Sequence, residues 1–207
     1  MNFITYESNN AKALKKLKKI KPSYFGRGDK ANVFLYDEKS NGLTHVILKL
    51  NDEYLIRTKL FEEYTAIPFD HYINVFFNLK KPNIFIEESL SAYLDVAIEF
   101  LESESKINIK RKEIKNNSFI NLNNRFYNSS QITRLEYLDK KTESDVTLDY
   151  VSNAIWEGLS MSEIEIEFMN WRFPDFYASV GNNGKLKLDN SNDEFLIEWL
   201  GVFCNEI

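Results

Sequence analysis

The chain has 207 residues, of which 43% are apolar and 14% aromatic, and it carries a formal net charge of −5. Sixteen Phe and eleven Tyr against seven Gly and four Pro exclude a wholly disordered chain, because they supply enough apolar surface for a folded core. Two histidines and one cysteine are too few for a cysteine-rich zinc site or a thiol redox pair. We therefore expect no cofactor and no metal, and the composition leans against an enzyme.

The sequence gives no sign of export or membrane insertion. The strongly apolar stretch 72–79 is far shorter than the roughly 20 residues that a membrane-spanning helix needs. The first residues lack the basic region and apolar run of a secretory signal, and one cysteine cannot form an internal disulfide. These features predict a cytoplasmic protein.

The first half of the chain predicts a basic helix followed by hairpins. Residues 11–21 place apolar side chains at helical spacing among six lysines, and Pro22 ends the run. Alternating patterns and turn residues then predict strands over 32–36, 44–50, 54–61, 71–79 and 83–86, with turns at 40–42 and 51–53. The first three of these strands would form a meander and the last two a hairpin.

The second half mixes helices and strands. The patterns predict helices over 90–101, over 146–159 and from Asn192 onward, and strands over 131–138, 163–168, 173–180 and 185–188. Residues 103–130 are rich in Lys, Asn and Ser with scattered Ile and Phe; they could hold short strands and are also the candidate boundary or long exposed loop. The chain should thus form a single α+β domain over 1–207, with a candidate subdomain boundary within 103–130. Its sheet should be mainly antiparallel, built from hairpins and meanders, with three to four helices packed on it.

Basic residues gather near the start of the chain and acidic residues near its end. Between Ala11 and Lys30 eight basic residues face one acid, a local charge of +7. From Glu136 to Ile207 fifteen acids face five bases, a local charge of −10. Such charge runs often only keep a surface soluble, but an acidic C-terminal half also favours a basic partner.

The acidic segment contains a regular row. Glu163, Glu165 and Glu167 alternate with apolar residues, which predicts a half-buried strand with three carboxylates on one face. Like charges at every second position repel each other, and a basic neighbour or ligand would relieve them. The residue types that anchor interfaces follow soon after, at Trp171, Arg172 and Tyr177. These six residues are the candidate partner-binding site, although core packing also explains aromatic residues in such a segment.

A second candidate site uses cations of the N-terminal region. Gly26-Arg27-Gly28 precedes a predicted strand and Lys49 ends the next one, a pattern typical of phosphate-binding loops but weak by itself. The protein-kinase motifs His-Arg-Asp and Asp-Phe-Gly are absent from the sequence. Arg27, Lys30 and Lys49 remain the alternative phosphate-binding site, and the lysines of 11–21 could contact nucleic acid. A sequence pI near 5.3 argues against a dedicated nucleic-acid binder.

The sequence offers little for catalysis. Glu113-Ile114-Lys115 matches the end of a metal-dependent nuclease pattern, but the preceding acid, Asp95, lies inside a predicted helix. His45 and His71 could each act as a general base, yet no recognisable motif ties a serine or cysteine to either. We name no catalytic residue.

The sequence therefore favours a small cytosolic protein-binding module. Its mechanism would be steric and electrostatic occlusion of a protein with a basic surface, as in bacterial or phage inhibitor and immunity proteins. The alternative is a nucleotide- or nucleic-acid-associated protein or enzyme that uses the N-terminal basic region. Nucleic acid is the less favoured partner, and no membrane contact is expected.

Overall fold

The computed structural model describes residues 1–20, 30–57, 64–189 and 192–207. The chain divides into two compact units. We call Met1–Glu7, Asn83–Phe85 and Lys110–Ile207 the sheet unit, and Ser8–Pro82 and Ile86–Ile109 the hairpin unit. Antiparallel strands and helices occur in both, which confirms the α+β class. Within the described ranges, no helix is long and apolar enough to cross a membrane.

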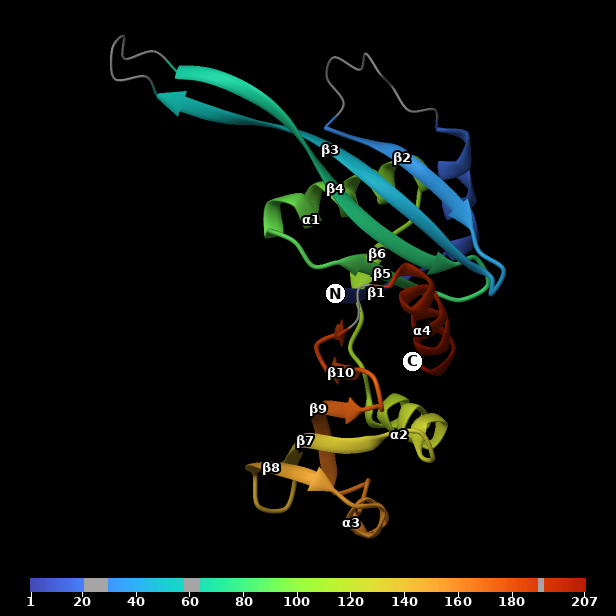
Figure 1. Cartoon of the computed structure of the whole chain (residues 1–207), viewed down its shortest axis with the longest axis vertical. Coiled ribbons are helices and arrows are strands. Elements are labelled where there is room, and N and C mark those ends of the chain that lie inside the picture. The colour runs from blue at the N-terminus through green and yellow to red at the C-terminus, as the bar shows by residue number, and fades with distance from the viewer. Residues whose placement is uncertain (21–29, 58–63, 190–191) are drawn as a thin grey trace. The chain divides into compact units, whose positions relative to one another are not determined.

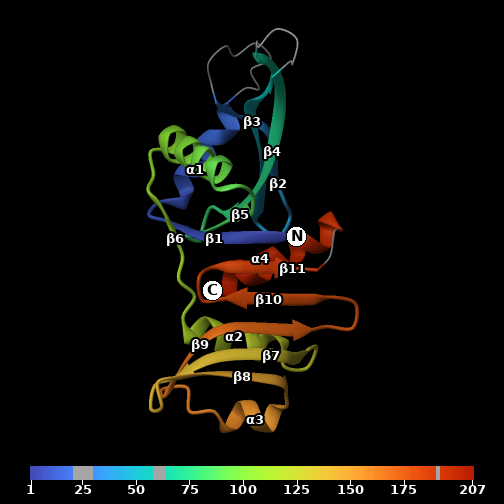
Figure 2. The same ribbon diagram turned by 90° about the vertical axis from the view of Figure 1, so that its left-hand side faces the viewer.

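The hairpin unit packs two helical segments on a three-stranded sheet. Its elements are η1 (Ala11–Lys19), β2 (Ala31–Glu38), β3 (Leu43–Arg57), β4 (Tyr64–Asn78) and α1 (Ser91–Ser105), and β5 (Asn83–Glu87) contributes its last two residues. Strand β3 lies between β2 and β4, so that Leu48 faces both Val33 and Ile73 in the core. Helices η1 and α1 cover one face of these strands, and among the described residues no element covers the opposite, open face (Figures 1 and 2).

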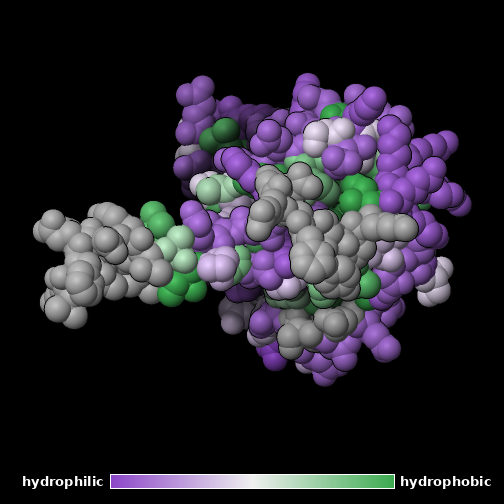
Figure 3. Space-filling model, turned by 90° about the horizontal axis from the view of Figure 1, so that it is seen from above, coloured by the Kyte–Doolittle hydropathy of each residue, from purple (hydrophilic) through white to green (hydrophobic). Residues whose placement is uncertain are grey.

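Strand β3 is much longer than the sequence predicts. The expected turn at 51–53 is wrong, because β3 pairs with β4 without interruption from Leu43↔Asn78 to Arg57↔Tyr64. Beyond Ala31 of β2 the hairpin is only two strands wide, and it exposes large apolar side chains: Tyr54, Leu55 and Ile67. Figure 3 shows apolar atoms on this projecting part of the hairpin.

A side-chain hydrogen bond ties β3 to the start of α1. The Tyr93 hydroxyl donates to Asp52 Oδ2 at 2.6 Å. This bond favours the charged form of Asp52 and lowers its pKa from the ordinary 3.8. The same bond raises the pKa of Tyr93 from 10.0 to about 12, because it stabilises the neutral phenol.

We expect Tyr93→Phe to lower the urea midpoint near neutral pH and to lose this effect in acid. A carboxyl whose folded pKa is depressed contributes stability above its unfolded pKa, and that stability is lost as the pH falls through the folded value. The hydrogen bond also stops stabilising the fold at high pH. Because the pKa of Tyr93 is raised in the folded protein, that stability is lost as the pH rises from 10.0 toward about 12. Urea unfolding of both proteins across this range checks the prediction. A difference between them that does not vary with pH would assign the effect to ring packing instead.

The sheet unit is a longer antiparallel sheet with helices on one face. Its strands are β1 (Asn2–Ser8), β6 (Ile109–Arg111), β7 (Gln131–Asp139), β8 (Ser144–Val151), β9 (Ile164–Arg172), β10 (Tyr177–Gly181) and β11 (Lys185–Leu188). Its helices are α2 (Asn116–Phe126), α3 (Asn153–Gly158) and α4 (Asp193–Glu206). The strands are ordered β1-β11-β10-β9-β7-β8, and β6 lies beside β1. Figure 2 looks onto the open face of β7 to β10, with α2 and α4 behind them.

Two predictions for this unit are wrong. Residues 146–159 do not form one helix: β8 occupies 144–151, and the short helix α3 begins after Ser152, whose hydroxyl accepts from the Ile155 amide at 3.3 Å. Residues 103–130 are not a long loop, because Phe119, Leu122 and Phe126 form the buried stripe of α2. The predicted final helix is confirmed, and Asn192 caps α4 by accepting from the Phe195 amide.

Candidate protein-binding surface

The open face of β7, β8, β9 and β10 presents polar and aromatic side chains in rows set by strand register. One row runs from Tyr177 to Arg172 and Gln131, and the next from Asn170 to Arg134 and Asp149. Two further rows follow toward the other end of the strands: Phe168, Glu136 and Thr147, and then Glu165, Leu138 and Asp145. Every member of these rows is exposed or half-buried. The intervening residues are mostly buried, and α2 and α4 cover that face of the strands (Figure 2).

The three glutamates of the acidic segment do not form a straight row. Opposite β7, the register of β9 shifts between Ile166 and Phe168, so that Glu167 is the extra residue of a β-bulge. Glu163 precedes the strand and pairs with Lys141 at 2.7 Å, which raises the pKa of that lysine. Only Glu165 takes the expected place on the open face, and the bulge and the ion pair together relieve the repulsion of a regular row.

Trp171 lies in the core and not on the surface. Its side chain is 0% exposed, and its indole Nε1 donates to Asn123 Oδ1 of α2 at 3.1 Å. The ring meets Phe126 edge to face, at 5.7 Å between centroids. A partner could not reach this side chain on the folded chain, so its predicted role as an interface anchor is corrected to core packing.

Arg172 and Tyr177 do meet on the open face, where they border a shallow hollow. The hollow holds about 390 Å³ and is lined by Thr133, Arg134, Asp149, Tyr150, Asn170, Arg172 and Tyr177. Tyr177 is 42% exposed and Tyr150 is 67% exposed, so a partner could reach both residues. The hollow thus places two tyrosines and two arginines within one small area.

The backbone at Tyr150 is in an unusual conformation. Its φ of +54° lies in the left-handed region, which a bulky aromatic residue rarely adopts. The β7–β8 ladder keeps one register from Arg134↔Asp149 to Ile132↔Val151, but Thr133 and Tyr150 between these pairs are not paired, and opposite β9 Thr133 is the extra residue of a bulge. Val151 is buried while Tyr150 is turned outward, so the local distortion places an aromatic ring on the surface.

The charges around the hollow are only partly paired. Arg134 Nε donates to Glu136 Oε1 at 2.6 Å. Among the residues that the structure describes, Arg172 and Asp149 have no side-chain bond or ion pair. Segment 136–167 contains nine acids and two bases; of these acids, Asp149 lines the hollow and Glu136 pairs with Arg134. Two further acids of the same face, Asp145 and Glu165, lie toward the other end of the strands.

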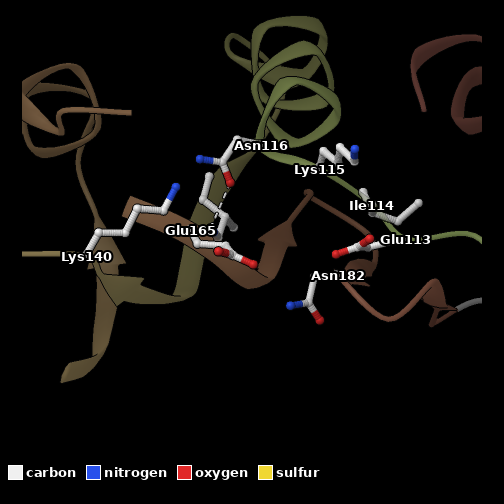
Figure 4. Close-up of a pocket in the computed structure, with 8 residues that line it drawn as sticks. Glu113, Ile114, Lys115, Asn116, Lys140, Glu165 and Asn182 are labelled. Carbon is white, nitrogen blue, oxygen red and sulfur yellow. Dashed lines mark hydrogen bonds between the residues drawn. The ribbon is translucent and has the colours of Figure 1, made fainter. Parts of the chain in front are cut away.

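Glu165 lines a separate pocket beside the first residues of β9, which β10 does not reach. There the Asn116 side chain replaces a neighbouring strand: its Oδ1 accepts from the Ile166 amide at 2.9 Å, and its Nδ2 donates to the Ile164 carbonyl at 2.9 Å. The pocket beside it holds about 300 Å³. Figure 4 shows the carboxylates of Glu113 and Glu165 facing the space between them. In the described chain, no group of three His, Cys, Asp or Glu side chains could hold a metal ion.

The alternative phosphate site lies partly outside the described residues. Arg27 lies outside the described residues, and Lys30 is exposed at the start of β2. Lys49 pairs with Asp70 at 2.8 Å, and this bond raises the pKa of the lysine. Its charge is therefore already matched by a carboxylate on the neighbouring strand.

Both histidines have side-chain partners. His45 Nε2 lies 2.8 Å from Asn74 Oδ1, and its ring stacks on Phe76. His71 Nε2 lies 2.9 Å from the Ser89 hydroxyl, and its ring stacks on Tyr93 at 4.3 Å between centroids. These contacts join β4 to β3 and to the start of α1.

Five residues of the hollow were not predicted from the sequence: Thr133, Arg134, Asp149, Tyr150 and Asn170. Two of them lie in the segment that the helical spacing of Leu148, Val151 and Ile155 assigned to a helix. The polar–apolar alternation over 145–149 was the available signal for a strand. No known family model and no curated protein matches this chain, so the candidate surface rests on its geometry and chemistry.

Proposed function

We propose that the chain is a cytoplasmic protein-binding module that covers a basic surface of its partner with the open face of β7 to β10. Its action would be steric and electrostatic occlusion, the mode of a bacterial or phage inhibitor or immunity protein. The observation that carries this proposal is the exposed ring of Tyr150, held in the left-handed region beside Tyr177 and Arg172.

An exposed tyrosine in this conformation costs stability. For a residue with a Cβ, the left-handed region is less favourable by about 1–2 kcal/mol. Burial does not offset this cost, because the Tyr150 side chain is 67% exposed. Strained backbone of this kind concentrates at functional sites, where a ligand makes use of the position.

The residue types fit a protein interface. Tyrosine and arginine are enriched among the residues that contribute most binding energy, and they cluster near the centre of an interface inside a polar rim. Tyr150, Tyr177 and Arg172 would form that centre. The acidic rim would include Asp145 and Glu165, both exposed on the same face, and it would select a partner of opposite charge.

The test compares full-length baits that differ at one exposed tyrosine. Wild type, Tyr177→Ala and Tyr72→Ala are used to capture proteins from lysate of the source cell, and the captured partner is then titrated against each bait. Tyr72 is 43% exposed and Tyr177 42%, so Tyr72→Ala removes the same ring at the same exposure from the other unit. We expect Tyr177→Ala to raise Kd about 30-fold, because an anchor residue contributes about 2 kcal/mol. Tyr72→Ala should leave this Kd unchanged.

Charge should act mainly on the rate of association. Asp145→Asn together with Glu165→Gln should slow association with a basic partner and weaken its salt dependence, since rim charges steer the encounter. Circular dichroism melting of each bait controls for folding. The proposal fails if Tyr177→Ala binds the partner like wild type while folded, or if Tyr72→Ala loses it.

A further inference from the structure

Strand β8 is the outermost strand of the sheet unit and has one edge to which a further strand could be added. Strand β7 pairs with its other edge, from Asp139↔Ser144 to Ile132↔Val151 (Figure 2). Among the described residues, no hydrogen bond from outside the β7–β8 ladder reaches the backbone of β8. The helix α3 follows the strand, but its bonds go to Ser152 and Tyr127. The outward N–H and C=O groups of β8 are therefore available to a partner.

The fold closes a comparable open stretch of β9 but not that of β8. At the first residues of β9, the Asn116 carboxamide accepts from the Ile166 amide and donates to the Ile164 carbonyl, in place of a neighbouring strand. Strand β8 has no such substitute within the described ranges. It also contains neither proline nor lysine, two residues that commonly protect an exposed edge from strand addition.

The side chains of β8 alternate between carboxylates on one face and apolar groups on the other. Asp145 and Asp149 are exposed on the open face, and neither has a hydrogen bond or an ion pair in the described part of the chain. Val146 and Leu148 lie on the opposite face and are half-buried. An added strand would place its own side chains beside these on both faces, so basic residues fit the first row and apolar residues the second.

The same two carboxylates disfavour a second copy of this chain as the added strand. In a two-fold antiparallel pair of β8 strands centred on Thr147, Asp145 of each copy would lie directly opposite Asp149 of the other. Like charges at directly opposed positions destabilise a sheet, whereas opposite charges stabilise it. The acidic row therefore selects a basic strand.

We propose that β8 binds an extended segment of the partner protein as an added strand, in which Lys or Arg alternates with apolar residues. The backbone of that segment would pair with residues 144–149, up to the left-handed Tyr150. Its cations would lie beside Asp145 and Asp149, and its apolar side chains would extend the cover over Val146 and Leu148. This inference rests on the proposed function, because β8 is the outer strand of the open face, and it specifies which part of the partner that face recognises.

The experiment follows the backbone amide signals of the full chain by NMR while a peptide is added. The probe is a capped peptide of about eight residues in which Lys and Val alternate, long enough to pair along β8. We expect the amide signals of 144–149 to shift and their hydrogen exchange to slow, because the outward amides gain acceptors. Three comparison peptides have Lys and Val in separate blocks, Glu in place of Lys, or a methyl group on every backbone nitrogen. Each should bind at least about tenfold more weakly, since each loses the alternation, the charge or the backbone donors.

Matched variants of the chain test the acidic row. Asp145→Asn together with Asp149→Asn should weaken binding of the alternating peptide about tenfold and reduce its salt dependence, because two cross-strand charge pairs are lost. Asp175→Asn together with Asp189→Asn is the control, since it removes the same charge from two exposed acids that lie before β10 and after β11. The control should keep full affinity. Melting curves of both variants establish that the fold is retained.

The added strand is refuted if the alternating peptide leaves the β8 signals unchanged at about 1 mM, a concentration that detects even weak binding. Equal binding of the methylated peptide or of the block peptide would also refute it, since either would show attraction to positive charge without strand pairing. The proposed function is judged separately, by the affinity of Tyr177→Ala for the captured partner. If that affinity falls but the exchange of the β8 amides is unchanged in the partner complex, only the added strand is wrong.

Discussion

Trp171→Ala should destabilise the sheet unit more than any other single truncation that we consider. The side chain is 0% exposed, and burial of this kind makes Trp→Ala cost about 3–5 kcal/mol. The indole also donates to Asn123 Oδ1, and Asn123 is only 4% exposed. Losing that donor leaves a buried carbonyl oxygen unsatisfied, which costs roughly a further 1–3 kcal/mol. Urea unfolding followed by circular dichroism measures the sum.

Trp171→Phe separates the hydrogen bond from the packing. It keeps an aromatic ring in the core but removes the donor, so we expect a loss of roughly 1–3 kcal/mol. Trp156→Phe is the control, because Trp156 is buried at 7% exposure and makes no side-chain hydrogen bond within the described part of the chain. If folded Trp171→Ala unfolded at the wild-type urea concentration, Trp171 would not be the core residue described above.

Gly184→Ala should be the second large effect, because the position has no room for a methyl group. Gly184 has a φ of +81°, and an added Cβ would lie 2.5 Å from the Lys112 carbonyl oxygen and 3.1 Å from that of Thr5. Both atoms belong to the backbone, and the Thr5 amide itself donates to the Gly184 carbonyl at 2.8 Å. Relief of the clash would therefore disturb the contacts of β1 and β6 with this turn.

The expected cost is roughly 2–5 kcal/mol, from the left-handed conformation and from overpacking together. Gly158→Ala provides the comparison, since an added Cβ there has no neighbour within 4 Å. That variant should be neutral or slightly stabilising, because alanine restricts the unfolded chain. Thermal melting of both proteins measures the contrast. Equal melting temperatures for the two variants would contradict the close packing around Gly184.

The local sequence pattern predicted the helices that bury a regularly spaced stripe of their own side chains. Helix α1 follows from the spacing of Leu94, Ala97 and Leu101, all buried, and α4 follows from a similar stripe after its Asn192 cap. The 3₁₀ geometry of η1 was not foreseeable, because apolar residues at spacings of three and four fit both helix types. Helix α2 was missed since its many asparagines have low helix propensity, although Phe119, Leu122 and Phe126 carry the spacing.

Long-range pairing decided what the local pattern could not. The spacing of Leu148, Val151 and Ile155 matches a helix. In the structure, however, Leu148 pairs with Leu135 and Val151 with Ile132, both on the neighbouring strand β7. Long-range strand pairing also limited how well the sequence predicted the candidate surface. Alternation places Glu165 outward, but the bulge at Glu167 reverses the phase, and Trp171 then points into the core while Arg172 points out. A bulge depends on the partner strand, so the sequence of β9 alone does not reveal it.

The central claim is that Tyr150 and Tyr177 lie at the centre of a protein interface, and radical footprinting of the purified complex tests it most directly. Hydroxyl radicals modify exposed tyrosine rings, and four such rings serve as internal reporters: Tyr150, Tyr177, Tyr54 and Tyr72. We expect modification of Tyr150 and Tyr177 to fall several-fold when the partner is bound, because interface centres exclude water. Tyr54 and Tyr72 should react as in the unbound protein. Unchanged modification of Tyr150 and Tyr177 in the complex, with protection of Tyr54 and Tyr72 instead, would contradict the claim.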